Sequence, residues 1–299
     1  MNKYSTKFVR LILLFVALLY GINPTVVKLG IKNMPALTFT TLRLLVATIS
    51  FLILLNHSKT YKKVKKADVH KFIFMGLGGL VFQLGLIYGL KYVTAATAST
   101  IIAVMPISVM MINRFVKHKI IEKNKYIGAI ITMMGIFLIT QNGVNYNYDS
   151  NTSKIGIILL LIAQLAAAIY TVISEDLVKR YSHYQVSTIM FGLVFLGFII
   201  ISSSELIRLD INLVPLTGWV CILYGGIFSL CIANTLWIFG VEKIGSNETS
   251  IYNNLPPVFS LLSGMIILNE KPLYLQIIGI FIVTIGMYIF SKNRDKIDG

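Results

Sequence analysis

The 299-residue sequence has little charge, and the shortage is greatest for acidic residues. Only 13% of its residues are charged, with 12 acidic side chains against 27 lysines and arginines, whereas a typical soluble domain is about 25% charged. The sequence is instead 56% hydrophobic, with a mean hydropathy of +0.77. Apolar runs near the length that spans a bilayer recur along it. This composition excludes an ordinary soluble domain and predicts an all-α polytopic membrane protein.

Cysteine is also scarce, and the two residues present are not spaced for a disulfide. Cys221 and Cys231 lie in one predicted helix, where ten residues correspond to about 15 Å. A disulfide requires Cα atoms roughly 4.4–6.8 Å apart. We therefore expect both cysteines to be packing residues.

Acidic residues and histidines are missing from the interior of the apolar runs. All 12 carboxylates and all 4 histidines fall in predicted loops or near span ends. This argues against a carboxylate or histidine proton relay, an intramembrane metal site and a membrane serine protease. No nucleotide-binding loop of the Walker type occurs. We therefore predict a protein that is not an enzyme and that uses no cofactor or metal.

The basic residues lie in short loops, which is a signal of membrane topology rather than of nucleic-acid binding. They concentrate in the N-terminal tail and in the segments 59–71 and 114–125. This bias predicts cytoplasmic N- and C-termini in the cytoplasmic (inner) cell membrane. The predicted partners are the lipid bilayer and a small-molecule substrate, with no nucleic acid, and the sequence carries no signal for an oligomeric state.

Ten transmembrane helices are predicted from the apolar runs. The start of the chain resembles a signal peptide but lacks a clear small-x-small cleavage site, so we interpret it as an uncleaved first helix. The predicted spans are 8–27, 35–55, 72–90, 95–115, 126–140, 155–173, 186–203, 216–241, 249–268 and 273–290.

The two halves of the chain repeat each other across the polar loop 141–153. An offset of 151 residues places Pro106 on Pro257, and it also aligns Gly89 with Gly240, Ser99 with Ser250, Gly128 with Gly279 and Gly135 with Gly286. Glycine and proline are informative because they mark backbone requirements. Five spans per half is an odd number, so the second copy must be inverted in the membrane. We predict five-helix repeats over 1–145 and 146–299.

Polar segments that contain proline interrupt two predicted spans, at 97–109 and 248–262. Proline removes a backbone donor and clashes with the carbonyl four residues earlier. In lipid, such freed groups are tolerated only where protein or a water-filled cavity satisfies them. We therefore predict helix breaks at Pro106 and Pro257, and a third at Pro24 beside Asn23, around a transport site.

The candidate substrate-binding residues are neutral amides, hydroxyls and aromatic side chains inside spans. This set suits a zwitterionic or amphipathic small molecule better than a bare cation. The candidates are Asn23, Gln83, Tyr88, Thr97, Thr100, Gln164, Tyr170, Tyr224, Asn234, Trp237, Tyr252, Asn253 and Asn254.

Several of these residues have an equally simple structural interpretation. Gln83 and Gln164 could bond across helices as structural contacts, and the tyrosines could be packing or interfacial residues. Arg43 is the only charge deep in a predicted span. It is either a functional intramembrane charge or a helix-packing residue bonded to backbone carbonyls.

Several motifs together resemble the drug/metabolite transporter superfamily, in its ten-helix branch with two EamA domains. The first half carries YGINPTVVKLG, TTLRLLVA, TAATASTIIAVMPISVMM and YIGAIITMMGIFLI, and the second carries GSNETSIYNNLPPVFSLLSGMIILNE and IIGIFIVTIGMYIF. The resemblance implies alternating access by two inverted halves, and export of amino acids or similar small metabolites. The sequence departs from the family at one position. An acidic residue often follows the proline-containing helix in both halves; Glu270 supplies it in the second half, whereas Lys119 occupies the aligned position in the first.

The leading hypothesis is therefore a secondary transporter that exports amino acids or similar metabolites. The site would lie between the halves, where Asn253 and Asn254 hold polar groups of the substrate and Trp237 with the tyrosines holds its apolar part. A non-transporting membrane scaffold or sensor built on the same repeats is the alternative. An intramembrane enzyme would need a catalytic constellation that the sequence does not show.

Overall fold

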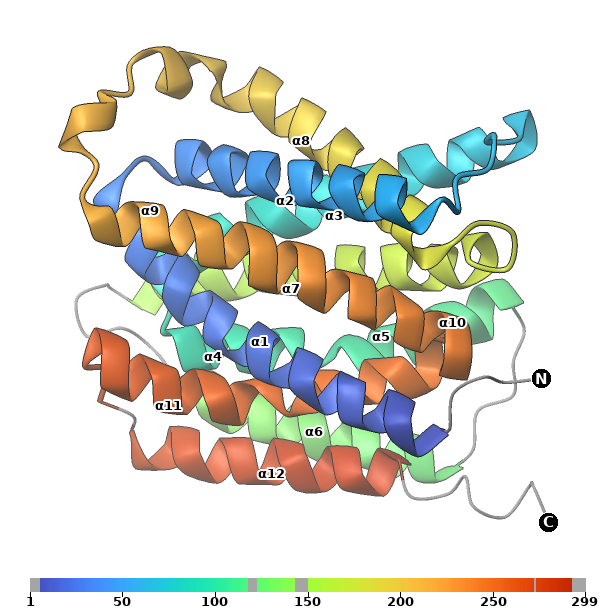
Figure 1. Cartoon of the computed structure of the whole chain (residues 1–299). Helices are drawn as coiled ribbons and strands as arrows, with labels where there is room; N and C mark the ends of the chain where they lie inside the picture. Colours follow the sequence, from blue (N-terminus) through green and yellow to red (C-terminus); the bar gives the residue numbers. More distant parts are fainter. Residues whose placement is uncertain (1–5, 118–122, 143–149, 272, 292–299) are drawn as a thin grey trace.

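The computed structural model describes residues 6–117, 123–142, 150–271 and 273–291, and this part of the chain is almost entirely helical (Figure 1). Lys119 and the predicted boundary between the halves at 145/146 lie outside the described residues, as does much of the loop 141–153. The helical architecture confirms the class of polytopic membrane protein that the composition predicts.

The helices of the first half follow one another with short connections. They are α1 (Thr6–Asn33), α2 (Ala36–Ser58), α3 (Lys66–Tyr92), α4 (Ala95–Ile102), α5 (Met105–Lys117) and α6 (Lys123–Asn142).

The second half adds three short segments of other helix types, of which η1 and η3 are 3₁₀ turns and η2 is π-helical. Its elements are α7 (Ser150–Leu177), α8 (His183–Ile207), η1 (Ile211–Leu213), α9 (Leu216–Leu223), η2 (Tyr224–Ala233), α10 (Asn234–Ile251), η3 (Tyr252–Asn254), α11 (Pro256–Leu268) and α12 (Tyr274–Ser291).

The local sequence explains several helix boundaries. The helix α1 ends just before Pro35, because proline disfavours a helical conformation in the residue that precedes it. The side chain of Thr94 accepts the backbone N–H of Thr97 at the start of α4, and Ser182 accepts that of Gln185 at the start of α8. Such N-caps satisfy backbone donors that the first helical turn leaves without a partner.

Each predicted span coincides with helix, but the described residues contain seven helical segments long and apolar enough to cross a membrane. One of these is the 53-residue segment Leu216–Leu268, which is not a single straight helix. Gly245 inside it has φ 82°, a conformation that favours glycine, and Figure 1 shows the chain turning back at the end of α10, so that α11 runs in the direction opposite to α9. The number of ten crossings stays a prediction.

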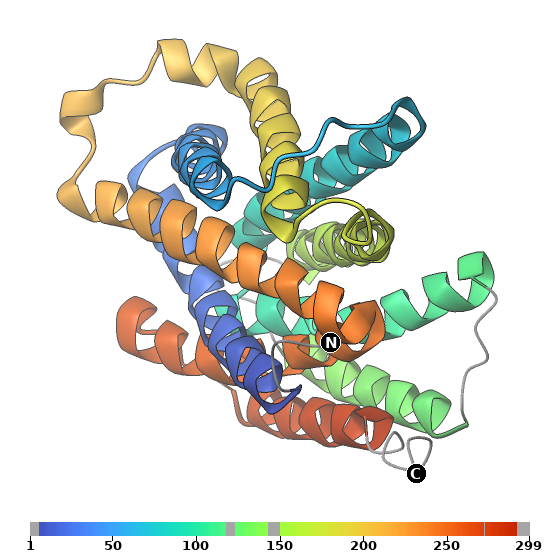
Figure 2. The ribbon, with the colours of Figure 1, turned by 45° about the vertical axis from the view of Figure 1, so that its right-hand side comes forward.

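The helices α6 and α12 lie side by side and bring glycines of the two halves together (Figures 1 and 2). A Cβ on Gly128 would meet the carbonyl oxygen of Gly286 at 2.6 Å, and one on Gly135 would meet that of Gly279 at 2.8 Å. The partner's number falls as the glycine's number rises, so the helices are antiparallel. Gly128 faces Gly286, which is the counterpart of Gly135 at the offset of 151 residues, and Gly135 faces Gly279, the counterpart of Gly128. A two-fold axis perpendicular to both helices would produce such reciprocal contacts.

The helix interruptions of the two halves fall at equivalent positions. The helix α4 begins after Thr94, whose counterpart at an offset of 151 is the kinked Gly245. The helix α5 then begins at Met105, whose counterpart is Pro256, the first residue of α11. The broken segments are therefore a shared feature of both halves.

Large apolar side chains cover the outer faces of the helices. Ile53 on α2, Ile200 on α8 and Ile266 on α11 expose 64%, 75% and 78% of their surface. An exposed apolar surface of this extent would be unusual on a soluble monomer. It is typical of helices that face lipid.

Candidate functional site

A cavity lies between the two halves of the chain. Its walls come from α1, α3, α4 and α5 in the first half and from α7, α8, η2, α10, η3 and α11 in the second. The centre of a water molecule can reach about 70 Å³ of it. At roughly 10–15 Å³ per water molecule, the cavity has room for about five waters or a small solute. Its polar lining residues are Tyr20, Asn23, Gln83, Ser99, Tyr170, Ser229, Asn234, Trp237 and Asn253.

Helix interruptions from both halves meet at this cavity. Ile102 and Met105 flank the break between α4 and α5, Asn253 and Pro256 flank that between η3 and α11, and all four line the cavity. Backbone groups freed at such breaks are tolerated in a membrane only where they meet protein or water. The breaks therefore belong to the construction of the cavity.

The prolines predicted to break helices act in different ways. Pro106 and Pro257 are the second residues of α5 and α11, so each begins the helix that follows a break. Proline is tolerated there because the first helical turn has no partner for its N–H groups. Pro24 lies inside α1, which continues past it, and its side chain lines the cavity.

Arg43 is a fully buried charge directly behind the cavity wall. Its Nη1 donates to Oδ1 of Asn23 at 3.4 Å, and its Nη2 donates to Oε1 of Gln83 at 2.5 Å. Both acceptors line the cavity, whereas Arg43 itself does not. No ion pair joins Arg43 to any described carboxylate. The sequence left open whether this charge is functional or structural, and the structure bonds it to two predicted site residues rather than to backbone carbonyls.

Aromatic rings from both halves form much of the remaining wall. The rings of Tyr20 and Trp237 lie 6.0 Å apart between centroids, and those of Phe82 and Tyr170 lie 6.2 Å apart in an edge-to-face arrangement. The indole Nε1 of Trp237 is buried and has no hydrogen-bond partner among the described residues. Buried donors are normally paired, so this N–H is an exception in the wall of the cavity.

Two asparagines of the second half place further amides at the cavity. Asn234 donates through Nδ2 to the hydroxyl of Ser187 at 3.2 Å, and Nδ2 of Asn253 lies 2.6 Å from Sδ of Met105. A thioether is a weak acceptor, so the amide of Asn253 has only a weak partner in this conformation.

The structure therefore brings part of the predicted set together at one place. The predicted residues that line the cavity are Asn23, Pro24, Gln83, Tyr170, Asn234, Trp237 and Asn253.

Three other predicted polar residues do not line the cavity and bond within the helix bundle. Thr97 accepts a hydrogen bond from Nε2 of Gln276 at 3.3 Å, and Thr100 donates to a backbone carbonyl one turn earlier. Gln164 donates to the hydroxyl of Ser108 at 2.8 Å. The contacts of Thr97 and Gln164 follow the interhelical alternative for polar residues in membranes, whereas the bond of Thr100 lies within its own helix.

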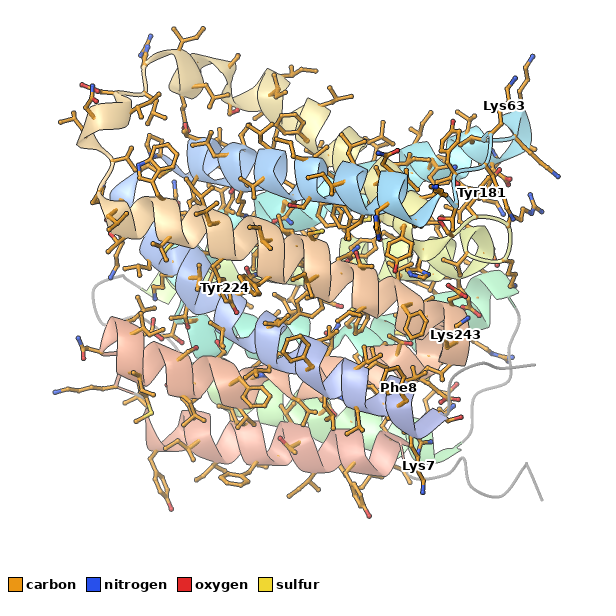
Figure 3. All side chains as sticks on the ribbon, viewed as in Figure 1. Lys7, Phe8, Lys63, Tyr181, Tyr224 and Lys243 are labelled. Carbon is orange, nitrogen blue, oxygen red and sulfur yellow. The ribbon has the colours of Figure 1, made fainter. Side chains whose placement is uncertain are left out.

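The remaining candidates also lie outside the lining. The Lys91 ammonium lies 4.8 Å from the ring centre of Tyr88. Tyr224, which is labelled in Figure 3, donates its hydroxyl to a backbone carbonyl of α1 at 3.4 Å. Asn254 donates to the backbone carbonyl three residues earlier, and Tyr252 is half-buried beside it. Asn254 thus stabilises the turn that presents Asn253.

Sequence reasoning missed several lining residues. Tyr20 and Ser99 carried a usable signal, because Tyr20 lies one helical turn before Asn23 and Ser99 lies in the polar segment before Pro106. Phe82 and Met105 carried none, since apolar side chains in an apolar helix do not reveal which side faces a cavity.

Polar contacts join the two halves on either side of the cavity. At one end of the bundle, Nζ of Lys28 lies 2.6 Å from Oε1 of Glu270, and Glu270 also accepts the backbone N–H of Ala95 at 3.3 Å. At the other end, Nδ2 of Asn113 donates to Oδ1 of Asn247 at 2.7 Å. Each contact crosses between α1–α6 and α7–α12.

The described residues contain no group of three or more histidine, cysteine or acidic side chains placed to hold a metal ion. Cys221 and Cys231 are both free and buried. The chemistry available at the cavity is therefore hydrogen bonding, ring contact and the field of Arg43.

Comparison with known proteins identifies relatives along nearly the whole chain. The sequence model of the EamA-like transporter family matches residues 7–141 and 154–292. The uncharacterized transporter YetK of Bacillus subtilis (strain 168) is 25% identical over 93% of this chain and 85% of its own length. An uncharacterized transporter of Archaeoglobus fulgidus is 26% identical over 92% of this chain and 95% of its own length.

A solved crystal structure shares the fold. It superposes with a TM-score of 0.70 over 94% of this chain and 97% of its own, at 14% sequence identity.

Proposed function

Because the chain belongs to the EamA-like transporter family, we propose that it is a secondary transporter that exports amino acids or similar small metabolites by alternating access. The two matched stretches accord with the resemblance found in the sequence motifs. Export and the amino-acid class rest on that resemblance.

The cavity between the halves carries the proposal. Its polar side chains come from both halves, and the helix breaks that flank it lie at equivalent positions in the two repeats. A site at a repeat interface, built from discontinuous helices, is the arrangement through which rocking halves expose a substrate alternately to the two sides. A scaffold has no need of such a cavity.

We further propose that the halves, 1–145 and 146–299, are inverted repeats with five membrane spans each. The antiparallel packing of α6 on α12 and the reciprocal glycine contacts support this arrangement. Figure 3 shows Lys7, Lys63 and Lys243 at one end of the bundle. By the positive-inside rule, that end and both termini are cytoplasmic, in the cytoplasmic cell membrane.

Efflux from cells that overproduce the chain tests the function. Cells loaded with a mixture of amino acids and related metabolites should enrich at least one compound outside, relative to cells without the protein. Asn253→Ala should abolish this enrichment at matched membrane levels because Asn253 lines the cavity. Asn212→Ala is the control, because it makes the same change at an exposed residue outside the cavity.

The outcomes separate the two hypotheses. A scaffold would show no enrichment of any compound, which would contradict the transporter proposal. Enrichment that survives Asn253→Ala would keep a transporter and remove Asn253 from its site.

A further inference from the structure

We propose that the cavity binds the anionic group of its substrate, and that Arg43 acts on this group through the amides of Asn23 and Gln83. This inference rests on the proposed function and names the chemical class of the substrate. The sequence alone suggested a neutral site, because Arg43 could not be placed relative to the other polar residues.

The chemistry of the guanidinium fixes the orientation of both amides. Arginine can only donate hydrogen bonds, so the atoms that face Arg43 must be the amide oxygens of Asn23 and Gln83. The nitrogen of an amide diverges from the oxygen, because both are bonded to the same trigonal carbonyl carbon. The NH₂ groups of Asn23 and Gln83 are therefore directed away from Arg43, and neither donates to another described residue.

The amides of Asn23 and Gln83 consequently offer only hydrogen-bond donors to the cavity. Their two NH₂ groups are joined by the weakly partnered NH₂ of Asn253, and Trp237, whose Nε1–H has no described partner, also lines the cavity. No carboxylate is among the lining residues. Because Arg43 occupies the oxygens of Asn23 and Gln83, these two amides favour a ligand group that only accepts, such as a carboxylate.

The charge of Arg43 acts in the same direction. It is buried and has no ion pair with a described residue, so its field is weakly screened at the cavity. The field disfavours a cation and favours an anion. The aromatic rings beside the donors would contact the apolar part of an amphipathic acid.

Three ring compounds that differ only in their polar group serve as probes: benzoate, benzamide and benzylamine. At neutral pH the first is an anion, the second is neutral and the third is a cation. Purified full-length Trp219→Phe protein in detergent retains Trp237 as its only tryptophan, so the fluorescence of Trp237 reports binding at the cavity. We expect benzoate to bind at least tenfold more tightly than benzylamine, with benzamide between them.

Gln83→Glu is the informative variant. The new carboxylate keeps an acceptor for Arg43, neutralises its charge and removes one NH₂ donor, so the fold retains the contact. Benzoate should then bind at least tenfold more weakly, and its advantage over benzylamine should disappear. Gln276→Glu makes the same chemical change outside the cavity, where Gln276 accepts the N–H of Leu273 at the start of α12, and should leave the order of the three probes unchanged.

Equal or tighter binding of benzylamine in the Trp219→Phe protein would overturn the inference. So would an unchanged order in Gln83→Glu, or no binding of any probe. Failure of the efflux assay while benzoate selectivity holds would count against the transporter proposal alone. Efflux together with cation selectivity would count against the anion inference alone.

Discussion

The ion pair between Lys28 and Glu270 should stabilise the conformation in which the halves are joined at that end of the bundle. The side chains expose 11% and 17% of their surface, and their charged atoms lie 2.6 Å apart. Breaking a buried pair costs about 3–5 kcal/mol, whereas an exposed pair contributes about 0–1 kcal/mol. A pair of intermediate burial at the end of the bundle should contribute about 2 kcal/mol of coupling.

A double-mutant cycle measures this coupling without assuming that either substitution is neutral. The four proteins are the unmodified chain, Lys28→Met, Glu270→Gln and the double variant, and the measurement is thermal unfolding in detergent. At about 2.1 cal/mol/K of unfolding entropy per residue, about 2 kcal/mol corresponds to a shift in the midpoint of about 3 °C in a chain of 299 residues. The double variant should be less destabilised than the sum of the single variants by this amount.

An exposed pair provides the matched control. Lys179 lies 3.4 Å from Asp176, and its side chain is 67% exposed, so the cycle Lys179→Met with Asp176→Asn should give a coupling near zero. If the Lys28–Glu270 cycle gives the same value as this control, the pair does not hold the halves together and the reasoning from burial fails.

Three further predictions follow from the packing. Gly128→Val should lower the unfolding temperature and the membrane yield because its side chain would meet the backbone of α12, whereas Gly192→Ala, with no atom within 4 Å of its added Cβ, should lower neither. Arg43→Lys should lower the unfolding midpoint by several degrees, because an ammonium cannot reproduce both bonds of the planar guanidinium. Cys221 and Cys231 should react with a thiol reagent only after unfolding, as mass spectrometry of labelled native and denatured protein would show, since both are buried.

The sequence predicted the helical membrane class and the family because these depend on long apolar runs and on motif order. The repeat offset could also be read from glycines and prolines, since such residues are placed by backbone geometry rather than by their neighbours. Gly245 shows the limit of this approach. The polar residues 242–248 separate two predicted spans, but they do not reveal that the chain stays helical on both sides of Gly245 and turns back at this one residue through its positive φ.

The site was harder to predict than the fold. Asn253 and Asn254 are chemically identical neighbours, and the direction of the 3₁₀ turn η3 decides that Asn253 lines the cavity while Asn254 bonds to the backbone. The partners of Arg43 lie on α1 and α3, and no pattern within α2 indicates them. Contacts between distant helices of this kind require the fold.

The central claim is that this cavity is reached by substrate alternately from the two sides of the membrane. Ser99 and Ser229 line it from opposite halves, so each can carry a single cysteine in a Cys221→Ala, Cys231→Ala background. A membrane-impermeant thiol reagent would be applied to right-side-out and to inside-out vesicles. We predict that Ser99→Cys and Ser229→Cys are each modified from both sides. Modification from neither side, or from one side only, would contradict the account.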